Sequence, residues 1–82
     1  MKHQKIIPFY KKDKTRTSIT LSAYQLQILD SLAEYFGTSR NNFLCELTEM
    51  ANKEDKLNLS NYIKEKIIYR LVLLLGLKGI KL

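Results

Sequence analysis

The chain has 82 residues but only one cysteine, Cys45, and one histidine, His3. A single residue of each type excludes a disulfide framework and a Cys/His metal cluster within one chain. A core of this size is marginal on its own, and small domains commonly gain stability from disulfides, metals or self-association. Because the first two are excluded, we expect self-association.

Long apolar runs are also missing. The segment IIPFY near the start is too short for the hydrophobic region of a signal peptide, and Pro8 interrupts it. The segment IIYRLVLLLGL near the end is shorter than a bilayer-spanning helix requires, and it contains Arg70. These absences predict a soluble, cytoplasmic protein whose free thiol stays reduced.

The sequence offers no recognisable catalytic constellation. It has no paired carboxylates, no nucleophile beside a base, no glycine-rich phosphate loop and no cluster of metal ligands. Cys45 has no His, Asp or Asn organised around it. We therefore expect no enzymatic activity and no cofactor. Internal repeats and low-complexity segments are absent as well.

Positive charge is concentrated at one end of the chain. The formal charge is +6, and residues 1–16 carry six basic groups against one acidic group, whereas the other residues carry eight against seven. Such an arm suits a polyanion, either nucleic acid or an anionic membrane surface, and a solubilising, disordered tail is the simpler alternative. Since Pro8 lacks a backbone N–H, we expect residues 1–14 to be irregular.

Residues 15–21 alternate as a β-strand does, in a chain whose other segments have helical periodicity. The inward side is made of Thr17, Ile19 and Leu21. The outward side is made of Arg16, Ser18 and Thr20. An isolated strand leaves backbone groups unpaired, and no confident partner strand is evident within the chain. We therefore expect it to pair with the same strand of a second copy, antiparallel about a twofold axis, as an intermolecular two-stranded β-ribbon.

The first predicted helix follows directly. Ser22 and Gln25 form a capping-box pattern at its start, and Gly37 is suited to end it in the left-handed conformation. Its apolar residues cover an arc of about 200°, wider than the stripe of an ordinary surface helix. We expect this helix to be covered from two directions.

Two more helices are predicted. Thr38 or Ser39 caps the second, and after the polar linker NKEDKLN, Ser60 is a candidate cap for the third. The last turns of the third helix, LVLLLGL, are apolar on nearly every side, which favours burial against protein. A strand at residues 71–75 is the alternative for this segment.

The strand RTSITLS, the helix AYQLQILDSLAEYF, the turn GTSRNN and the helix FLCELTEMA follow one another within residues 15–52. In this order the chain resembles the ribbon-helix-helix DNA-binding proteins of the Arc, MetJ and CopG type. The resemblance implies a mainly α fold, a ribbon-helix-helix homodimer. The long arm and the third helix have no counterpart in the minimal motif of the family. We therefore divide the chain into a basic N-terminal arm (1–14), the DNA-binding domain (15–52) and a linker with an additional C-terminal helix (53–82), which we expect to form a dimer or higher-order interface.

The resemblance also implies site residues. The outward strand residues Arg16, Ser18 and Thr20 would read bases in the major groove, which a two-stranded ribbon fits. The start of the second helix would bind a phosphate, because free N–H groups and the positive end of the helix dipole attract anions. The arm exceeds the family motif, and from its charge we expect it to track phosphates or enter an adjacent minor groove, although its IIPFY segment could instead pack on the protein. The residues expected to contact phosphate are Thr38, Ser39, Arg40, Asn41, Lys11, Lys12 and Lys14.

These expectations describe a homodimeric, sequence-specific protein that binds double-stranded DNA, most simply a transcriptional repressor at an operator. One alternative is an antitoxin whose residues 53–82 bind a toxin, and another is a plasmid copy-control, partition or relaxosome protein with the same DNA-binding module. Adsorption to an anionic membrane surface has less support, because the apolar C-terminal end lacks a dense cationic face. The sequence leaves open the operator, any effector and assembly beyond the dimer.

Overall fold

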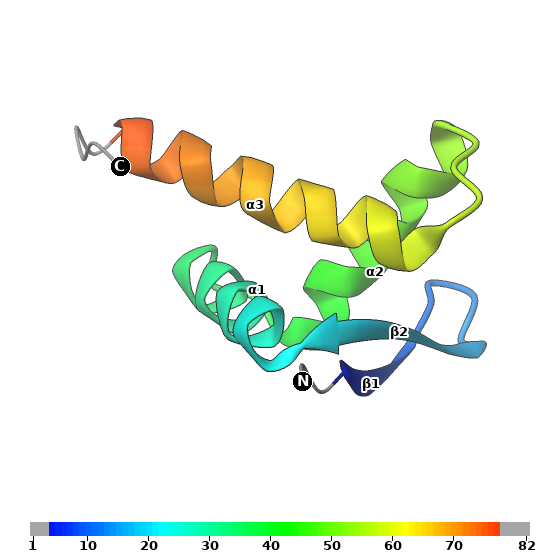
Figure 1. Ribbon diagram of the computed structural model, residues 1–82. Helices are drawn as coiled ribbons and strands as arrows, with labels where there is room; N and C mark the ends of the chain where they lie inside the picture. The colour runs from blue at the N-terminus through cyan, green and yellow to red at the C-terminus, as the bar shows by residue number, and fades with distance from the viewer. Residues whose placement is uncertain (1–3, 78–82) are drawn as a thin grey trace.

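The computed structural model describes residues 4–77 and contains a two-stranded antiparallel sheet followed by three helices. Its elements in chain order are β1 (Gln4–Tyr10), β2 (Arg16–Ser22), α1 (Ala23–Tyr35), α2 (Arg40–Lys53) and α3 (Leu59–Leu77). In Figure 1 the β-hairpin lies at the bottom, α3 crosses the top, and α1 and α2 lie between them. The prediction of a mainly helical fold with three helices after a strand is confirmed. The parts of the predicted N-terminal arm and C-terminal segment at residues 1–3 and 78–82 lie outside the described residues.

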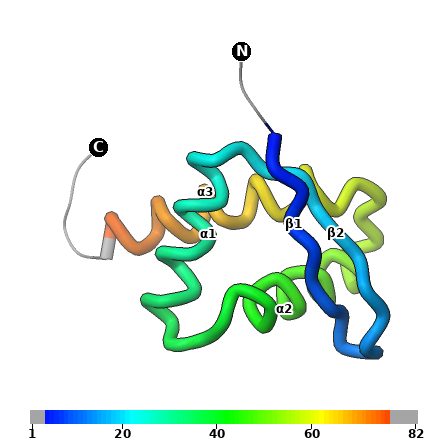
Figure 2. Tube along the Cα trace, turned by 90° about the horizontal axis from the view of Figure 1, so that it is seen from below, coloured from blue at the N-terminus to red at the C-terminus, as the bar shows by residue number. Residues whose placement is uncertain are grey.

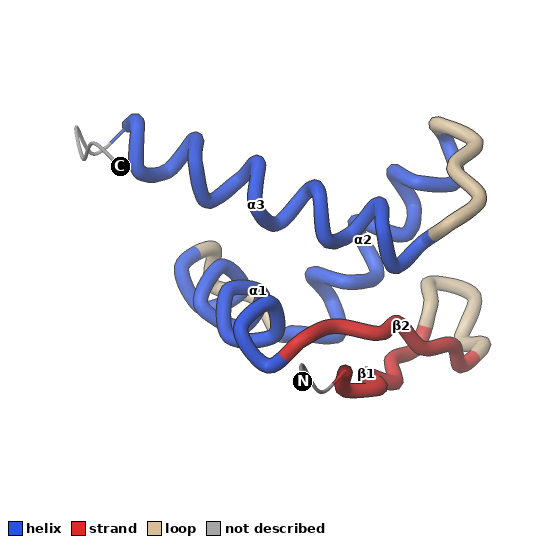
Figure 3. The backbone as a smooth tube through the Cα atoms, in the orientation of Figure 1, coloured by secondary structure: helices blue, strands red, loops and turns tan. Residues whose placement is uncertain are grey.

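The strand predicted at residues 15–21 is present as β2, but its partner is β1 of the same chain. The two strands pair antiparallel, from Gln4 opposite Ser22 to Tyr10 opposite Arg16, and form the red hairpin of Figure 3. The expectation of an irregular arm is therefore wrong for residues 4–10. The expectation that β2 finds no partner strand within its own chain is also wrong. The only reason to expect pairing of β2 with a second copy is a missing partner within the chain, so this reason no longer applies.

Pro8 fits within β1 because its nitrogen points away from β2. The backbone N–H of Tyr10, two residues further along, donates to Oδ1 of Asn41 at 2.9 Å and therefore faces the outer edge of the sheet. Backbone groups two residues apart in a strand face the same edge, so the nitrogen of Pro8 also faces the outer edge. No hydrogen bond to β2 is lost there, because β2 lies on the opposite side of β1. Proline is excluded from central strands but not from this position of an edge strand.

The hairpin turn is held by hydrogen bonds among residues 11–15. The N–H of Lys14 donates to the carbonyl of Lys11 at 2.9 Å, and the N–H of Lys11 donates to the carbonyl of Thr15 at 2.8 Å. Lys14 has a φ of 73°, in the left-handed region, as in hairpins whose β-turn is followed by one left-handed residue. The Asp13 carboxylate accepts from the hydroxyl and the N–H of Thr15, and these bonds lower the pKa of Asp13 below its ordinary value.

The inner face of the hairpin belongs to the core. Ile7 and Phe9 of β1 and Ile19 and Leu21 of β2 are all buried, which confirms the inward side predicted for the second strand. The buried helix residues of the same cluster include Leu29, Leu32, Phe43, Leu44, Leu47, Ile63 and Ile67. The hairpin is therefore fixed to the helices by burial of apolar area, the main stabilising term in folding.

The two ends of α1 lie where the sequence predicts them. Ser22 Oγ accepts from the N–H of Gln25 at 3.1 Å, and the Gln25 side chain accepts from the N–H of Ser22 at 2.9 Å, which completes the capping box. At the other end Gly37 has a φ of 69° and its N–H donates to the carbonyl of Glu34 at 3.0 Å. Only glycine adopts this conformation without a steric penalty from Cβ.

The cap of α3 differs from the prediction. Oδ1 of Asn58 accepts from the N–H of Asn61 at 3.0 Å, so Asn58 caps the helix that begins at Leu59. Ser60, the predicted cap, lies inside the first turn. Its hydroxyl instead accepts from the N–H of Thr20 at 3.1 Å and ties α3 to the edge of β2 that does not face β1.

The first half of α3 is buried in the core, whereas the second half packs against it through Leu71 and Leu74 and leaves Val72 and Leu73 exposed. Tyr62, Ile63 and Ile67 are buried. The Tyr62 hydroxyl donates to Glu54 Oε2 at 2.7 Å, and burial together with this bond raises the pKa of Tyr62 to about 12. Residues 71–75 are helical, so the alternative of a strand there is wrong. None of the helices described between residues 4 and 77 combines the length and hydropathy needed to cross a membrane.

Candidate nucleic-acid interface

The face of the hairpin opposite the helices is uncovered, as the view from below in Figure 2 shows. Alternate residues of a strand share one face, so β2 presents Arg16, Ser18 and Thr20 there. Arg16 and Ser18 are exposed and Thr20 is half-buried. The three residues predicted to read bases therefore lie in one row on a two-stranded ribbon, but both strands of this ribbon come from one chain.

A second row, which the sequence reasoning missed, comes from β1. Ile6 lies opposite Thr20, and Tyr10 lies opposite Arg16. Ile6 is 73% exposed and Tyr10 is 54% exposed, so the outer face combines a polar row with an apolar and phenolic one. The alternative that IIPFY packs on the protein applies to Ile7 and Phe9, which point inward, but not to Ile6 and Tyr10.

The hairpin turn places positive charge at one end of this face. Lys12 and Lys14 are exposed and Lys11 is half-buried. Across residues 4–77 none of these three lysines forms a salt bridge. Asp13, held as a carboxylate by Thr15, offsets one of the three positive charges. Glu49 of α2 lines a hollow with Lys11 and Lys12 and offsets part of their charge. The turn itself still carries a net positive charge, which attracts phosphates.

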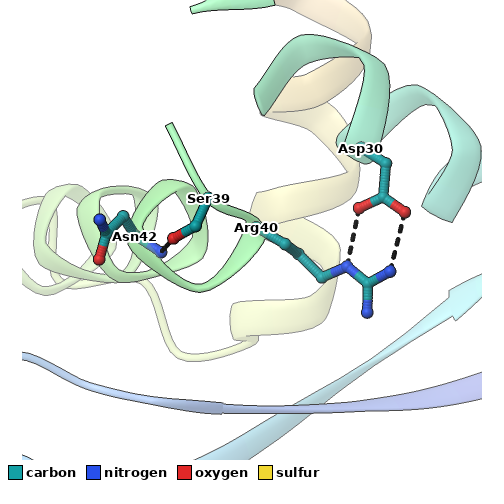
Figure 4. A network of polar contacts seen from close by, with 4 residues as sticks. All are labelled: Asp30, Ser39, Arg40 and Asn42. Carbon is teal, nitrogen blue, oxygen red and sulfur yellow. Dashed lines mark hydrogen bonds and ion pairs between the residues drawn. The ribbon is translucent and has the colours of Figure 1, made fainter. Parts of the chain in front are cut away.

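At the start of α2 the predicted phosphate contacts are engaged within the protein. Ser39 caps the helix by accepting from the N–H of Asn42 at 3.1 Å. The Arg40 guanidinium donates to both carboxylate oxygens of Asp30, at 2.7 and 2.8 Å, and these bonds raise the pKa of Arg40. Figure 4 shows Arg40 extending away from Ser39 and Asn42 toward Asp30. The carboxylate of Asp30 beside this helix end disfavours a second anion there.

Asn41 is also engaged, with the last residue of β1. Its side chain accepts from the N–H of Tyr10 at 2.9 Å and donates to the carbonyl of Tyr10 at 3.1 Å, in the manner of a neighbouring strand. Thr38 is half-buried. The start of α2 therefore holds α1 and the hairpin in place, while the outward row and the turn lysines form the surface that is open to a ligand.

Between residues 4 and 77 no group of three or more His, Cys, Asp or Glu side chains is arranged to hold a metal ion. Cys45 is a half-buried free thiol on α2. Comparisons of the chain with family models, curated proteins and solved structures found no match. The ribbon-helix-helix resemblance therefore stays a prediction from sequence.

Proposed function

We propose that the chain binds double-stranded DNA by placing its own β-hairpin in the major groove. The observation that carries the proposal is the exposed row of Arg16, Ser18 and Thr20 on a two-stranded ribbon whose turn is rich in lysine. The major groove of B-form DNA admits a two-stranded ribbon. A single chain supplies the whole ribbon, so each copy reads one short site by itself.

The side chains on this face have the chemistry for the task. The Arg16 guanidinium suits bidentate donation to O6 and N7 of guanine, and the hydroxyls of Ser18 and Thr20 donate or accept at base edges. Ile6, directly across from Thr20, offers an apolar contact for a thymine methyl group. The turn lysines contact phosphates at the groove border, which fixes the register of the ribbon but carries no sequence information.

Transcriptional repression is the biological role we attach to this binding, by occupation of an operator. The support for that role is the family resemblance of residues 15–52 together with an exposed row of side chains whose donors and acceptors suit base edges. The antitoxin alternative has less support, because Tyr62, Ile63 and Ile67 of α3 are buried in the core rather than held free for a toxin. A plasmid copy-control or partition role uses the same hairpin chemistry and would differ only in the site that is bound.

The decisive experiment measures binding to duplex DNA by fluorescence anisotropy across a range of salt concentrations, with the preferred sequence selected from a random pool. Replacing Lys11, Lys12 and Lys14 together by glutamine removes three phosphate contacts. We expect the slope of log affinity against log salt to become shallower by about 2.7, at roughly 0.9 per phosphate.

A matched control replaces Lys56, Lys64 and Lys66 by glutamine, the same change in net charge on α3 and the linker before it rather than on the hairpin. We expect this variant to keep the salt slope of the parent chain. Equal effects of the two triple variants, salt-indifferent binding, or a preference for single strands or RNA duplexes over DNA duplexes would contradict the proposal.

A further inference from the structure

A second exposed surface, apart from the hairpin face proposed to bind DNA, lies along α1 and the C-terminal half of α3. We call it the α1–α3 surface and define it by Tyr24, Tyr35, Ile68, Tyr69, Val72 and Leu75. A groove of about 440 Å³ runs between α1 and the C-terminal half of α3, with Tyr24, Tyr35 and Leu75 in its walls. Ile68 and Val72, which we call the Ile68–Val72 ridge, line a second hollow together with Gln25 of α1 and the charged residues Lys64 and Glu65 of α3.

The α1–α3 surface is large for one that faces solvent. Tyr24 is 68% exposed, Tyr69 59% and Val72 47%. Together with the other members it presents roughly 450–650 Å² of mainly apolar area, which is near the top of the range for the largest patch of an ordinary monomer and below the ~800 Å² per partner of a standard interface. The residues lining the groove add to this area when a partner enters it.

The charge pattern selects the partner. None of the residues lining the groove is a lysine, arginine, aspartate or glutamate. The second hollow is lined by one residue of each sign, Lys64 and Glu65. Neither hollow therefore favours a strongly acidic or a strongly basic partner. Two chains that each carry a formal charge of +6 repel one another wherever their charged surfaces meet. The C-terminal half of α3 and the hairpin turn lie at opposite ends of the molecule (Figures 1 and 2), so two copies joined along α3 keep their lysine-rich turns far apart.

We propose that the α1–α3 surface binds a second copy of the chain in a twofold dimer. In this dimer the Ile68–Val72 ridge of each copy lies in the α1–α3 groove of the other, which is an isologous contact between identical patches. The dimer forms through helices and leaves both hairpins free. It therefore replaces the strand-to-strand pairing expected from the sequence, and it does not depend on whether the hairpins bind DNA.

The test is the mass of the full chain in solution, measured by sedimentation equilibrium over a range of concentrations. We expect a dimer at twice the 9.6 kDa of one chain. The variant Val72→Glu puts a charge into the buried contact, and we expect its dimer dissociation constant to rise by roughly 100-fold or more. The control Leu57→Glu introduces the same charge at a side chain that is 98% exposed in the α2–α3 linker, and we expect it to dimerise as the parent chain does.

Circular dichroism establishes that each variant is folded. Should Val72→Glu fail to fold, Tyr24→Arg, an exposed position on α1 in the opposite wall of the groove, decides in its place with the same expected rise. A parent chain that stays monomeric at every concentration overturns the proposal, as does a folded variant with an unchanged dissociation constant. A monomeric parent chain that sediments with phosphatidylserine vesicles also overturns it and assigns the surface to membranes.

Discussion

The hairpin and the C-terminal half of α3 each leave a row of side chains uncovered, and the two rows differ in chemistry. In the hairpin, each inward residue such as Phe9 or Ile19 is followed by an outward one, so one face completes the core while the other stays in water. In α3 beyond Ile67, nearly every side chain is apolar, and Val72 and Tyr69 remain exposed. The hairpin buries its apolar face in the core and exposes a mainly polar face to water. The end of α3, in contrast, keeps apolar surface that the folding of one chain does not bury.

This difference separates two kinds of contact with other molecules. A polar, positively charged ribbon attracts a polyanion without requiring burial of apolar area, and its affinity falls with salt. An uncharged apolar surface attracts another apolar surface, and salt screening affects it little. Substitutions on the outer face of the hairpin should therefore change DNA affinity and its salt dependence, whereas substitutions on the α1–α3 surface should change self-association.

The largest effect is expected from the inner face of the hairpin. Phe9→Ala removes a side chain that is 2% exposed, so we expect it to lower the free energy of unfolding by about 3–5 kcal/mol. Ile6→Ala, on the outer face of the same strand, should change it by no more than about 0.5 kcal/mol. Urea unfolding followed by circular dichroism measures both, and similar losses for the two variants would mean that β1 does not pack on the helices as described.

A smaller effect is expected from the outer face, and only on recognition. Arg16→Ala should lose roughly 1–3 kcal/mol of discrimination between the selected DNA site and random duplex. Its unfolding free energy should stay close to that of the parent chain, because the described residues 4–77 include no hydrogen-bond partner for the guanidinium. Anisotropy titrations with both duplexes give the discrimination. An equal loss of affinity on both would show that Arg16 contacts phosphate and reads no base.

The smallest effect is expected at the turn, where two properties should move in opposite directions. Lys14 has a φ of 73°, which costs a residue with a Cβ about 1 kcal/mol relative to glycine. Lys14→Gly should therefore raise the free energy of unfolding by roughly 0.5–1 kcal/mol while it weakens DNA binding through the loss of one positive charge. Lys12→Gly, at a position without positive φ, should weaken DNA binding without the gain in stability. If Lys14→Gly is more stable but binds DNA with unchanged affinity, Lys14 does not contact DNA.

Local signals in the sequence were sufficient for much of the fold. The capping box of Ser22 and Gln25 fixed the start of α1, and Gly37 fixed its end, because both rest on hydrogen bonds within a few residues. The alternation of residues 15–21 gave the correct inward and outward sides of β2. That alternation is also what placed Arg16, Ser18 and Thr20 in the candidate site.

β1 could not be recognised in the same way. Ile6 is apolar but faces solvent, so the alternation with Ile7 and Phe9 is blurred, and Pro8 argues against a strand unless the strand is known to lie at an edge. The direction in which the nitrogen of Pro8 points depends on the register with β2. That register is a property of the folded hairpin rather than of the segment.

The partners of Arg40 and Asn41 were hidden for a related reason. The Arg40–Asp30 pair depends on how α1 and α2 pack, and the contact of Asn41 with Tyr10 spans 31 positions of the chain. A sequence read in local windows sees two polar residues at a helix start, which is the pattern of an anion site. Only the packed structure reveals that their side chains are already engaged.

The hairpin edges have a consequence for the protein at high concentration. Along β1, Pro8 provides no outward donor and Asn41 occupies the outward N–H and carbonyl of Tyr10; along β2, Ser60 occupies the outward N–H of Thr20. A strand from another molecule would find an interrupted ladder on either side, which hinders the stepwise stacking that produces fibrils. The outer face of this short hairpin can therefore remain exposed at high protein concentration without starting aggregation.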